Sequence, residues 1–465
     1  MHTCRDRKIR STAVYSTPDR LAHHVAMADA AVHIGEAPPA ESYLNMDRIV
    51  EAALRTKADA VHAGWGFLAE NPAFARRVID AGLTWIGPPP EVIHRMGDKI
   101  EAKRIARAAN VPVIPGIDHV TDAGQVRAWM REENVAFPVM LKAAGGGGGR
   151  GMVKVEHDAH LHMAIGQARS EAKKFFGSET VLAEKYVERG RHIEVQIVAD
   201  AHGNVVHLYE RECTIQRRHQ KIIEEAPSPT LDPALREEIC ETAARLMREI
   251  GYASAGTVEF LFDSETRRFY FLEVNTRLQV EHGITELITG VDIVGLMLDV
   301  AEGRKLPFTQ KQIRPNRWAL EVRLNAEDPR SFNPSFGNIS RLMVPMGPNV
   351  RLANGVYEGA DVPSYYDSLL MLVITAGKDR SDAIRVMDRC LGRNLRVEGV
   401  KTLQPLLLSI IRHPAFVAGE FSTRFIEEHL AELVATFRDT SPEDEVLKVA
   451  RFVAEITALG PRGWM

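Results

Sequence analysis

The segment RFYFLEVNTRLQVE, residues 268–281, carries three polar side chains whose types could bind a metal ion or an anion. After an apolar start, Glu273, Asn275 and Arg277 occupy alternate positions. Alternate residues of an extended chain point to the same side. The pattern therefore predicts a strand with a carboxylate, an amide and a cation on one face.

A second carboxylate is predicted to face Glu273. Residues 257–262 (TVEFLF) also read as a strand, and the polar residues that follow predict an antiparallel hairpin. Folding this hairpin symmetrically about Thr266 sets Glu259 opposite Glu273, where two carboxylates repel each other unless a cation intervenes or one is protonated. Mg²⁺ is usually held by one or two carboxylates together with substrate phosphates. A metal site at Glu259, Glu273 and Asn275 is one interpretation, and an ordinary solvated hairpin face is the alternative.

A run of five glycines, residues 145–149, lies between two predicted strands, residues 139–142 and 152–155. Without Cβ atoms, a loop can bring its backbone N–H groups onto phosphate oxygens. The run lacks the GK[ST] sequence and the following helix of a P-loop. We expect a phosphate-binding flap with Lys142 beside it, and a flexible linker is the alternative.

Further basic and polar groups lie on three other segments. Residues 180–187 predict a strand whose end suits the edge of an adenine pocket. Residues 211–221 (RECTIQRRHQK) suit either a clamp for an anionic substrate or a solvated face. A helix is predicted from near Lys99 to Asn110, with a solvated face that carries the remaining basic residues Lys103, Arg104 and Arg107.

The elements that must position these groups alternate in type along the chain. Short apolar strands and helices alternate over the first hundred residues, which implies a parallel sheet. After residue 308 the chain becomes strand-rich and then helical, which predicts a separate α+β domain. We therefore expect an α/β and α+β fold with an N-terminal Rossmann-like domain (1–97), a central domain (98–308) with a flap subdomain at about 115–187, a C-terminal domain (309–432) and a helical tail (433–465).

Composition excludes several classes of function. The chain has 465 residues, a net charge of -4 and no apolar run near the ~20 residues that cross a bilayer, so neither nucleic acid nor membrane is an expected partner. Its four cysteines are scattered, which argues against a disulfide framework or a structural zinc site and predicts a cytoplasmic setting. The first ten residues contain Asp6 and run into a predicted strand, which argues against a signal or transit peptide.

Several motifs together resemble the biotin carboxylase family. They are MGDK (96–99), Lys142 with the glycine flap, QRRHQK (216–221), EVNTRLQVEH (273–282), RLNAED (323–328), YYDS (365–368) and EGVKT (398–402). The resemblance covers nearly the whole chain and ends near Leu430. Other enzymes with the ATP-grasp fold share the flap and the metal carboxylates, but not the TRLQVEH continuation.

The resemblance implies an ATP-grasp ligase that makes carboxyphosphate from bicarbonate and MgATP, and then carboxylates N1 of biotin. The first domain would be the pre-ATP-grasp domain and the second the ATP-grasp domain. Residues implied at ATP are Lys99, Lys142, Gly148, Gly149, Glu184, Lys185, Tyr186, Val187, His192, Gln216, His219, Glu259 and Glu273.

The resemblance also implies roles in catalysis. Two divalent ions, Mg²⁺ or Mn²⁺, would bind Glu259, Glu273 and Asn275. Bicarbonate would bind Lys221, Arg277 and the backbone of Val280. Glu281 would be its general base, and Arg323 would stabilise the biotin enolate and carboxyphosphate. The implied catalytic residues are Arg277, Glu281, Arg323 and Lys221.

The family's partners are implied as well. The sequence contains no biotin-accepting Met-Lys-Met and no carboxyltransferase region after Leu430, so we expect a homodimer that works with a separate biotin carboxyl carrier protein and a carboxyltransferase subunit. The final acceptor would be an acyl-CoA (acetyl-, propionyl- or methylcrotonyl-CoA), in a pathway such as fatty acid biosynthesis. Two alternatives remain: another ATP-grasp ligase, with ATP turnover independent of biotin, or a truncated regulatory subunit that binds nucleotide without turnover.

The sequence departs from the family pattern at positions that carry no catalytic group. Trp65 stands where a Tyr is usual, Leu372 replaces a Lys, and prolines are replaced by Ala63, Gly283 and Phe336. Residues 1–5 align inside the family's first helix, so we expect the first strand and its Gly-Glu loop to be missing. This predicts that Met1 is not the natural start or that this form is impaired, unless a partner subunit or residues 3–10 fill the gap.

Overall fold

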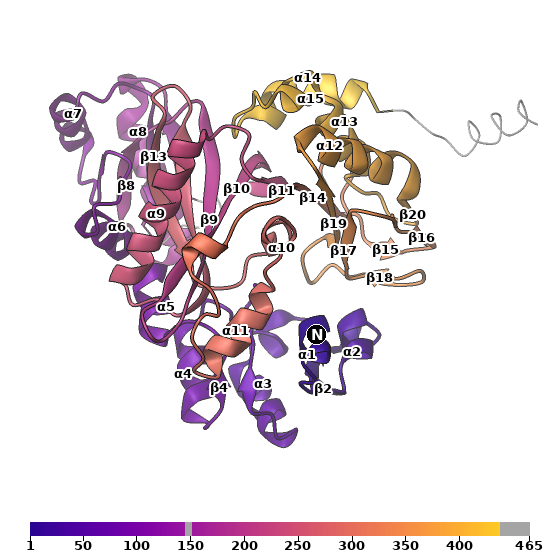
Figure 1. Cartoon of the computed structure of the whole chain (residues 1–465). Helices are drawn as coiled ribbons and strands as arrows, with labels where there is room; N and C mark the ends of the chain where they lie inside the picture. Colours follow the sequence, from indigo (N-terminus) through magenta and orange to yellow (C-terminus); the bar gives the residue numbers. More distant parts are fainter. Residues whose placement is uncertain (145–150, 438–465) are drawn as a thin grey trace, which may run out of the picture.

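The structure is a computed structural model that describes residues 1–144 and 151–437. Figure 1 shows the N-terminal part (indigo) beneath a large central body (purple to orange), with the C-terminal strands and helices (gold) beside it. The predicted fold class is confirmed, because α/β and α+β parts follow each other along the chain. Within the described residues, no helix is long and apolar enough to cross a membrane.

Two pairs of parallel strands make up the N-terminal part. Between the strands lie helices whose first turns are capped by asparagine side chains, Asn45 for α3 and Asn71 for α4. The predicted alternation is confirmed, but the two pairs are not hydrogen-bonded to each other within the described residues. The elements are α1 (His2–Asp6), β1 (Thr12–Ser16), α2 (His23–Met27), β2 (Ala30–Gly35), α3 (Met46–Arg55), β3 (Ala60–Val61), α4 (Pro72–Asp80), β4 (Thr84–Trp85) and α5 (Pro90–Gly97).

An antiparallel sheet of eight strands crosses the centre of the molecule and carries the polar motifs. Its strands, in spatial order, are β13 (Arg268–Asn275), β12 (Ser254–Asp263), β9 (Gly190–Ala199), β10 (Val205–Arg217), β11 (Gln220–Ala226), β14 (Trp318–Asn325), β19 (Leu369–Gly377) and β17 (Val350–Asn354). Because β14 pairs with β11, the sheet continues through the boundary at which a separate C-terminal domain was expected. The C-terminal strands are therefore fixed directly to the strands of the site.

Alternation along β9 explains how the sheet separates core from site. Ile193, Val195 and Ile197 pack into a hydrophobic core with α6 (Lys99–Ala108) and α9 (Pro233–Glu249), whose N-cap is Asp232. Glu194 and Gln196 project from the opposite face. Helices α10 (His282–Thr289) and α11 (Ile293–Ala301) pack on the sheet as well.

A smaller sheet of four strands forms the predicted flap subdomain. Its strands β6 and β7 pair antiparallel, from Val139 with Val155 to Lys142 with Met152, which confirms the predicted flap hairpin. The predicted phosphate contacts Gly148 and Gly149 lie outside the described residues. The elements are β5 (Gly116–Ile117), α7 (Ala123–Glu132), β6 (Val139–Ala143), β7 (Met152–Val155), α8 (Leu161–Phe176) and β8 (Val181–Lys185).

Helices cover the C-terminal end of the large sheet. Their core unites the apolar face of β14 and β19 with Ile222 and Ile223 of β11. Two small antiparallel pairs, β15 with β18 and β16 with β20, lie beside it. The elements are β15 (Gly337–Asn338), β16 (Arg341–Met343), β18 (Asp361–Val362), α12 (Arg380–Arg389), β20 (Arg396–Glu398), α13 (Gln404–Arg412), α14 (Pro414–Ala418) and α15 (Phe425–Ala435).

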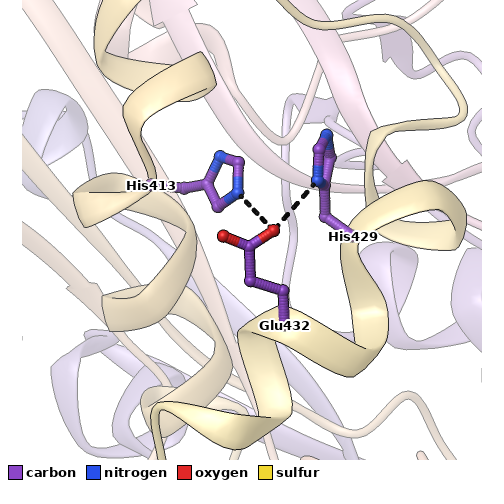
Figure 2. A group of neighbouring side chains, drawn as sticks. All are labelled: His413, His429 and Glu432. Atoms are coloured by element: carbon purple, nitrogen blue, oxygen red, sulfur yellow. Dashed lines mark ion pairs between the residues drawn. The ribbon is translucent and has the colours of Figure 1, made fainter.

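A charged group joins α14 to α15 (Figure 2). His413 caps α14 by accepting the Ala415 N–H on Nδ1 at 3.3 Å, and its Nε2 lies 3.3 Å from Glu432 Oε2. His429 Nδ1 lies 3.5 Å from the same oxygen. One carboxylate oxygen of α15 thus lies against a ring from α15 and a ring from the start of α14, and so connects the two helices. Of the predicted helical tail, residues 438–465 lie outside the described residues.

Candidate active site

The β12–β13 hairpin places two glutamates face to face, as predicted. Glu259 pairs directly with Glu273, and a β-bulge after Glu259 shifts the register toward the turn. The Glu273 side chain is 42% exposed, and Lys99 Nζ lies 3.9 Å from its Oε2. Partial withdrawal from water and the nearby charge of Glu259 raise the pKa of Glu273. We call this pair of carboxylates the Glu259–Glu273 edge. Among the described residues, the cation nearest to Glu273 in this edge is not in close contact with it.

Lys221, at the start of β11, lies among three buried carboxylates. Its Nζ donates to Glu194 Oε2 at 2.5 Å, to Glu259 Oε1 at 2.8 Å and to Glu281 Oε1 at 2.8 Å. We call these four residues the Lys221 cluster. Burial alone would lower the pKa of Lys221, but the three carboxylates hold it well above its ordinary value. The ammonium group therefore stays charged.

Arg323 reaches the cluster from β14. Its Nη2 donates to Glu281 Oε2 at 2.9 Å, and its Nε donates to Glu224 Oε1 at 2.6 Å. Burial would raise the pKa of Glu281, but Lys221 and Arg323 hold it well below its ordinary value. Glu281 is therefore an ionised carboxylate between two cations, with the charge state that a general base needs.

Arg211 does not belong to a substrate clamp, contrary to one interpretation of residues 211–221. Its side chain is 0% exposed and pairs with Glu194. Its Nη1 donates to Gln196 Oε1 and to Thr285 Oγ1, both at 2.8 Å. These bonds occupy the N–H donors of the guanidinium within the protein. Arg211 therefore holds Glu194 in the position where it contacts Lys221.

The rest of the basic segment is divided by the turn between β10 and β11. Arg217 Nη2 lies 2.8 Å from Glu327 Oε2, while Arg218 and His219 are exposed at the tip of the turn. Neighbouring residues of this segment therefore point in different directions. The number of basic residues in the sequence does not show which of them face the site.

His192 and Gln216 lie at the Glu259 side of the cluster. His192 Nε2 is 3.0 Å from Glu259 Oε2, and its Nδ1 is 2.8 Å from Gln216 Nε2. The two ring nitrogens therefore face the Gln216 amide and the Glu259 carboxylate. Two predicted nucleotide contacts are therefore connected to a predicted metal ligand.

Arg277 lies just beyond β13, on the side predicted from the alternation. It donates to Asn275 Oδ1 at 3.0 Å, to Gln279 Oε1 at 2.8 Å and to Glu70 Oε2 at 2.9 Å. Val280, whose backbone is a predicted bicarbonate contact, follows and is half-buried. Glu70 comes from the N-terminal part, so the Arg277 side of the site spans two parts of the chain.

The flap subdomain brings a second set of predicted residues together. Lys142 Nζ lies 2.6 Å from Glu184 Oε2, and Lys103 pairs with the same carboxylate. Lys103 is 8% exposed, so its predicted place on a solvated face is wrong, whereas Arg104 and Arg107 are exposed as predicted. The helical period of α6 turns Lys103 toward β8, and no local pattern indicates that a carboxylate lies there.

The other predicted nucleotide contacts line the same region. Lys185 Nζ lies 3.9 Å from Asp263 Oδ2, the Tyr186 ring lies 4.5 Å below Lys154 Nζ, and Val187 is buried. A cavity of about 480 Å³ opens beside Lys99. Its lining includes Lys99, Ile100, His119, Ala144 and Thr180.

Models of three protein domains match consecutive parts of the chain. They are the biotin carboxylase N-terminal domain over residues 1–93, the carbamoyl-phosphate synthase L chain ATP-binding domain over residues 98–309, and the biotin carboxylase C-terminal domain over residues 321–428.

Curated relatives match over nearly their whole length. The biotin carboxylase of Halalkalibacterium halodurans is 47% identical over 430 residues, which cover 92% of this chain and 94% of the relative. This chain belongs to the biotin carboxylase family. It is thus an ATP-dependent ligase.

Relatives whose names state the compound that is finally carboxylated have a similar sequence identity to this biotin carboxylase. A pyruvate carboxylase subunit of Methanothermobacter thermautotrophicus is 46% identical over 447 residues, with 96% of this chain and 90% of the relative covered. The mitochondrial propionyl-CoA carboxylase alpha chain of Mus musculus is 46% identical over 430 residues, with 92% of this chain and 59% of the relative covered.

Solved structures share the fold of this biotin carboxylase. The biotin carboxylase–β,γ-ATP complex of Campylobacter jejuni superposes with a TM-score of 0.88 at 42% identity, covering 92% of this chain and 95% of that chain. The biotin carboxylase domain dimer of Hydrogenobacter thermophilus 2-oxoglutarate carboxylase also has a TM-score of 0.88 at 42% identity, with 93% and 95% covered. That dimer was crystallised with MgADP, ADP and bicarbonate.

The residues of the Glu259–Glu273 edge fit a divalent ion. Two carboxylates lie directly opposite each other, and the pKa of Glu273 is raised, as expected where negative charge lacks a close cation. The buried Asn275 Nδ2 has no hydrogen-bond partner among the described residues, while its Oδ1 accepts from Arg277 Nη2. Oxygen donors in this number suit Mg²⁺ that also contacts substrate phosphates.

The space is tight at one departure from the biotin carboxylase family pattern. A Cβ on Gly283 would lie 2.6 Å from Ile374 Cδ1 of β19, so a side chain there would move the end of Ile374. Nothing in the structure explains Trp65, Ala63, Phe336 or Leu372 as replacements.

Four acidic residues that shape the site were missed from the sequence. Glu194 and Glu70 contact predicted catalytic groups, and Glu224 and Glu321 lie directly opposite each other on β11 and β14. For Glu194 a signal existed, because it alternates with the apolar residues Ile193, Val195 and Ile197, a pattern typical of a strand. Glu70 gave no such signal, because it reaches Arg277 from a loop 207 positions away.

Proposed function

We propose that this biotin carboxylase uses MgATP and bicarbonate to carboxylate biotin on a separate carrier protein, as the first half-reaction of an acyl-CoA carboxylase. The observation that carries the proposal is the Lys221 cluster with Arg323, in which one ionised carboxylate, Glu281, lies between two cations. Such an arrangement suits an anionic substrate that must lose a proton as it reacts.

Nucleotide binding falls to residues around the flap subdomain and the hairpin. Lys99 and Lys142 would neutralise ATP phosphates, with Gly148 and Gly149 of the flap over them. Residues 184–187 would border the adenine, while His192, Gln216 and His219 would contact ribose or phosphate. Glu259, Glu273 and Asn275 would hold two divalent ions, which supply charge neutralisation at the transferred phosphoryl group.

Bicarbonate activation falls to the Lys221 cluster. Lys221, Arg277 and the backbone of Val280 would hold the anion beside Glu281. As bicarbonate takes Lys221 as a partner, Glu281 would lose part of the charge that lowers its pKa and become a better proton acceptor. Glu281 would then accept the bicarbonate proton while the bicarbonate oxygen attacks the γ-phosphate, which yields carboxyphosphate and ADP.

Biotin activation falls to Arg323. Its guanidinium, fixed by Glu224 and Glu281, would face the ureido oxygen of biotin and stabilise the enolate as N1 loses its proton. Because these contacts are formed before substrate arrives, little reorganisation accompanies charge development.

Biotin-dependent ATP hydrolysis with free biotin and bicarbonate tests the proposed half-reaction. Omitting biotin or bicarbonate is expected to reduce turnover to background, and Glu281→Gln is expected to lower it by about 10²-fold or more. Glu302→Gln, at an exposed position, is the matched control. ATP turnover that does not respond to biotin would instead support a different ATP-grasp ligase.

The final acceptor and the assembly need a second experiment. Relatives of similar identity carry names with propionyl-CoA and with pyruvate, and an acyl-CoA is our proposal. Capture of the biotinylated carrier and carboxyltransferase by the tagged chain, followed by carboxylation assays with acetyl-CoA, propionyl-CoA and pyruvate, tests it. Activity with pyruvate alone would contradict it. Light scattering tests the proposed homodimer.

A further inference from the structure

Glu321, in the middle of β14, has a buried carboxylate without a partner. Its side chain is 0% exposed, and neither Oε1 nor Oε2 has a hydrogen-bond partner among the described residues. An ionised carboxylate in such a place is strongly unfavourable, and a protonated one is much less so.

The charges around Glu321 come from every element packed against it. Glu224 of β11 lies directly opposite, and Arg323 lies two residues along the same face of β14. From β10 and from the start of α10, Arg211 and Glu281 act at longer range. On the other side β19 contributes Ile374, and Arg351 of β17, near Gly283, is bound to Glu286 at 2.7 Å.

A count of buried charges shows why a proton must be present. Five buried carboxylates lie in and behind the site, Glu194, Glu224, Glu259, Glu281 and Glu321, against the three cations Arg211, Lys221 and Arg323. Metal ions at the Glu259–Glu273 edge would lie at the opposite end of this group. Burial, and then the charge of Glu224, raise the pKa of Glu321 well above its ordinary value, and burial raises that of Glu224 to about 7.

We propose that Glu321 is a positioning residue for Arg323, because its buried and unpartnered carboxyl, opposite Glu224 on the neighbouring strand, holds a proton and so leaves a single negative charge behind the guanidinium. With one charge there, Arg323 divides its donors between Glu224 and Glu281 and remains available to biotin. If both carboxylates ionise, the second charge draws the guanidinium inward, away from Glu281 and the substrate. The inference rests on the proposed role of Arg323 at biotin.

The pH profile of biotin carboxylation tests the inference through two variants. In the wild type, kcat is expected to fall at alkaline pH as Glu321 loses its proton, whereas Glu321→Gln, which cannot ionise, is expected to lose this alkaline fall. Its kcat at neutral pH should change by about threefold or less, since a neutral amide replaces the protonated carboxyl. Glu321→Asp, which can ionise, should restore the alkaline fall.

The KM for ATP separates positioning from a general structural role. It should stay within about twofold in both variants, because Arg323 acts only as charge develops on biotin. An unchanged pH profile in Glu321→Gln, or equal losses in ATP binding and carboxylation, would overturn the inference. Wild-type turnover that ignores biotin would contradict the proposed function itself, so the two failures are distinguishable.

Infrared difference spectroscopy keeps the inference testable if the variants fail to fold. In the wild type, a protonated carboxyl C=O band should be present at neutral pH and vanish at alkaline pH as Glu321 titrates. Its absence at neutral pH would overturn the inference.

Discussion

The Lys221 cluster and the Glu259–Glu273 edge share one carboxylate but differ in charge balance. In the cluster, Lys221 contacts three carboxylates at 2.5 to 2.8 Å, and Arg323 contacts the third of them at 2.9 Å. At the edge, Glu273 is partly exposed and faces a lysine at 3.9 Å. The cluster is organised before substrate arrives, which favours stabilisation of developing charge, whereas the edge gains its balance from ligands.

Breaking the cluster should have the largest effect. Lys221→Met leaves three buried carboxylates without their shared cation, and removing one partner of a buried ion pair costs about 3–5 kcal/mol. We expect a loss of ~10³-fold or more in biotin-dependent ATP hydrolysis. Urea unfolding should show the loss of stability in the same preparation.

The control for Lys221 is an exposed lysine in an ion pair. Lys401 is 69% exposed and pairs with Asp328, so Lys401→Met should change stability by no more than about 1 kcal/mol. Equal effects of the two substitutions would mean that the cluster is no more important than a surface pair.

Removing Arg323 should separate the two halves of the reaction. Arg323→Ala is expected to lower carboxybiotin formation by about 10²- to 10³-fold while ATP affinity stays within about threefold, because the guanidinium stabilises charge that develops only on biotin. Nucleotide titration beside carboxybiotin yield measures both. Arg317→Ala, exposed just before the same strand, is the control. Similar losses in both quantities would mean that Arg323 is structural.

The edge should respond to metal concentration where the cluster does not. Glu273→Gln is expected to lower ATP hydrolysis by ~10²-fold, and high Mg²⁺ should recover part of the loss, because the amide binds the ion less well. Lys221→Met should show no such recovery. Glu265→Gln, exposed in the turn of the same hairpin, is the control. Normal turnover of Glu273→Gln at limiting Mg²⁺ would contradict the metal assignment.

The contrast also shows which parts of the site a sequence can predict. The hairpin register, with Glu259 opposite Glu273, followed from alternation and turn position, because both are local. The cluster did not, because β9, β11 and β14 meet Glu281 from distant parts of the chain. The resemblance supplied Lys221, Glu281 and Arg323, but not the residues that fix them.

For the fold, too, the local features were predicted and the contacts between distant segments were not. The βα rhythm and the flap hairpin were predicted from periodicity, and both are present. The pairing of β11 with β14, which joins the central and C-terminal strands in one sheet, was not predicted. Strand order between distant segments depends on which faces bury each other, and one sequence pattern is compatible with several such orders.

The smallest expected effect is a change in how the free energy of unfolding depends on pH. Burial, and then the charge of Glu224, raise the folded-state pKa of Glu321 well above its ordinary value, so the folded chain holds a proton that the unfolded chain releases. Stability from this carboxyl is thus fully present below the unfolded-state pKa and is lost as pH rises toward the folded-state pKa. Glu321→Gln removes this titration, so its unfolding free energy should rise relative to wild type as pH increases through this window. Glu259 and Glu281, whose pKa values are depressed, contribute the opposite slope in both proteins and cancel in the difference. Urea unfolding at several pH values measures this difference, and two parallel pH profiles would show that Glu321 holds no such proton in the folded chain.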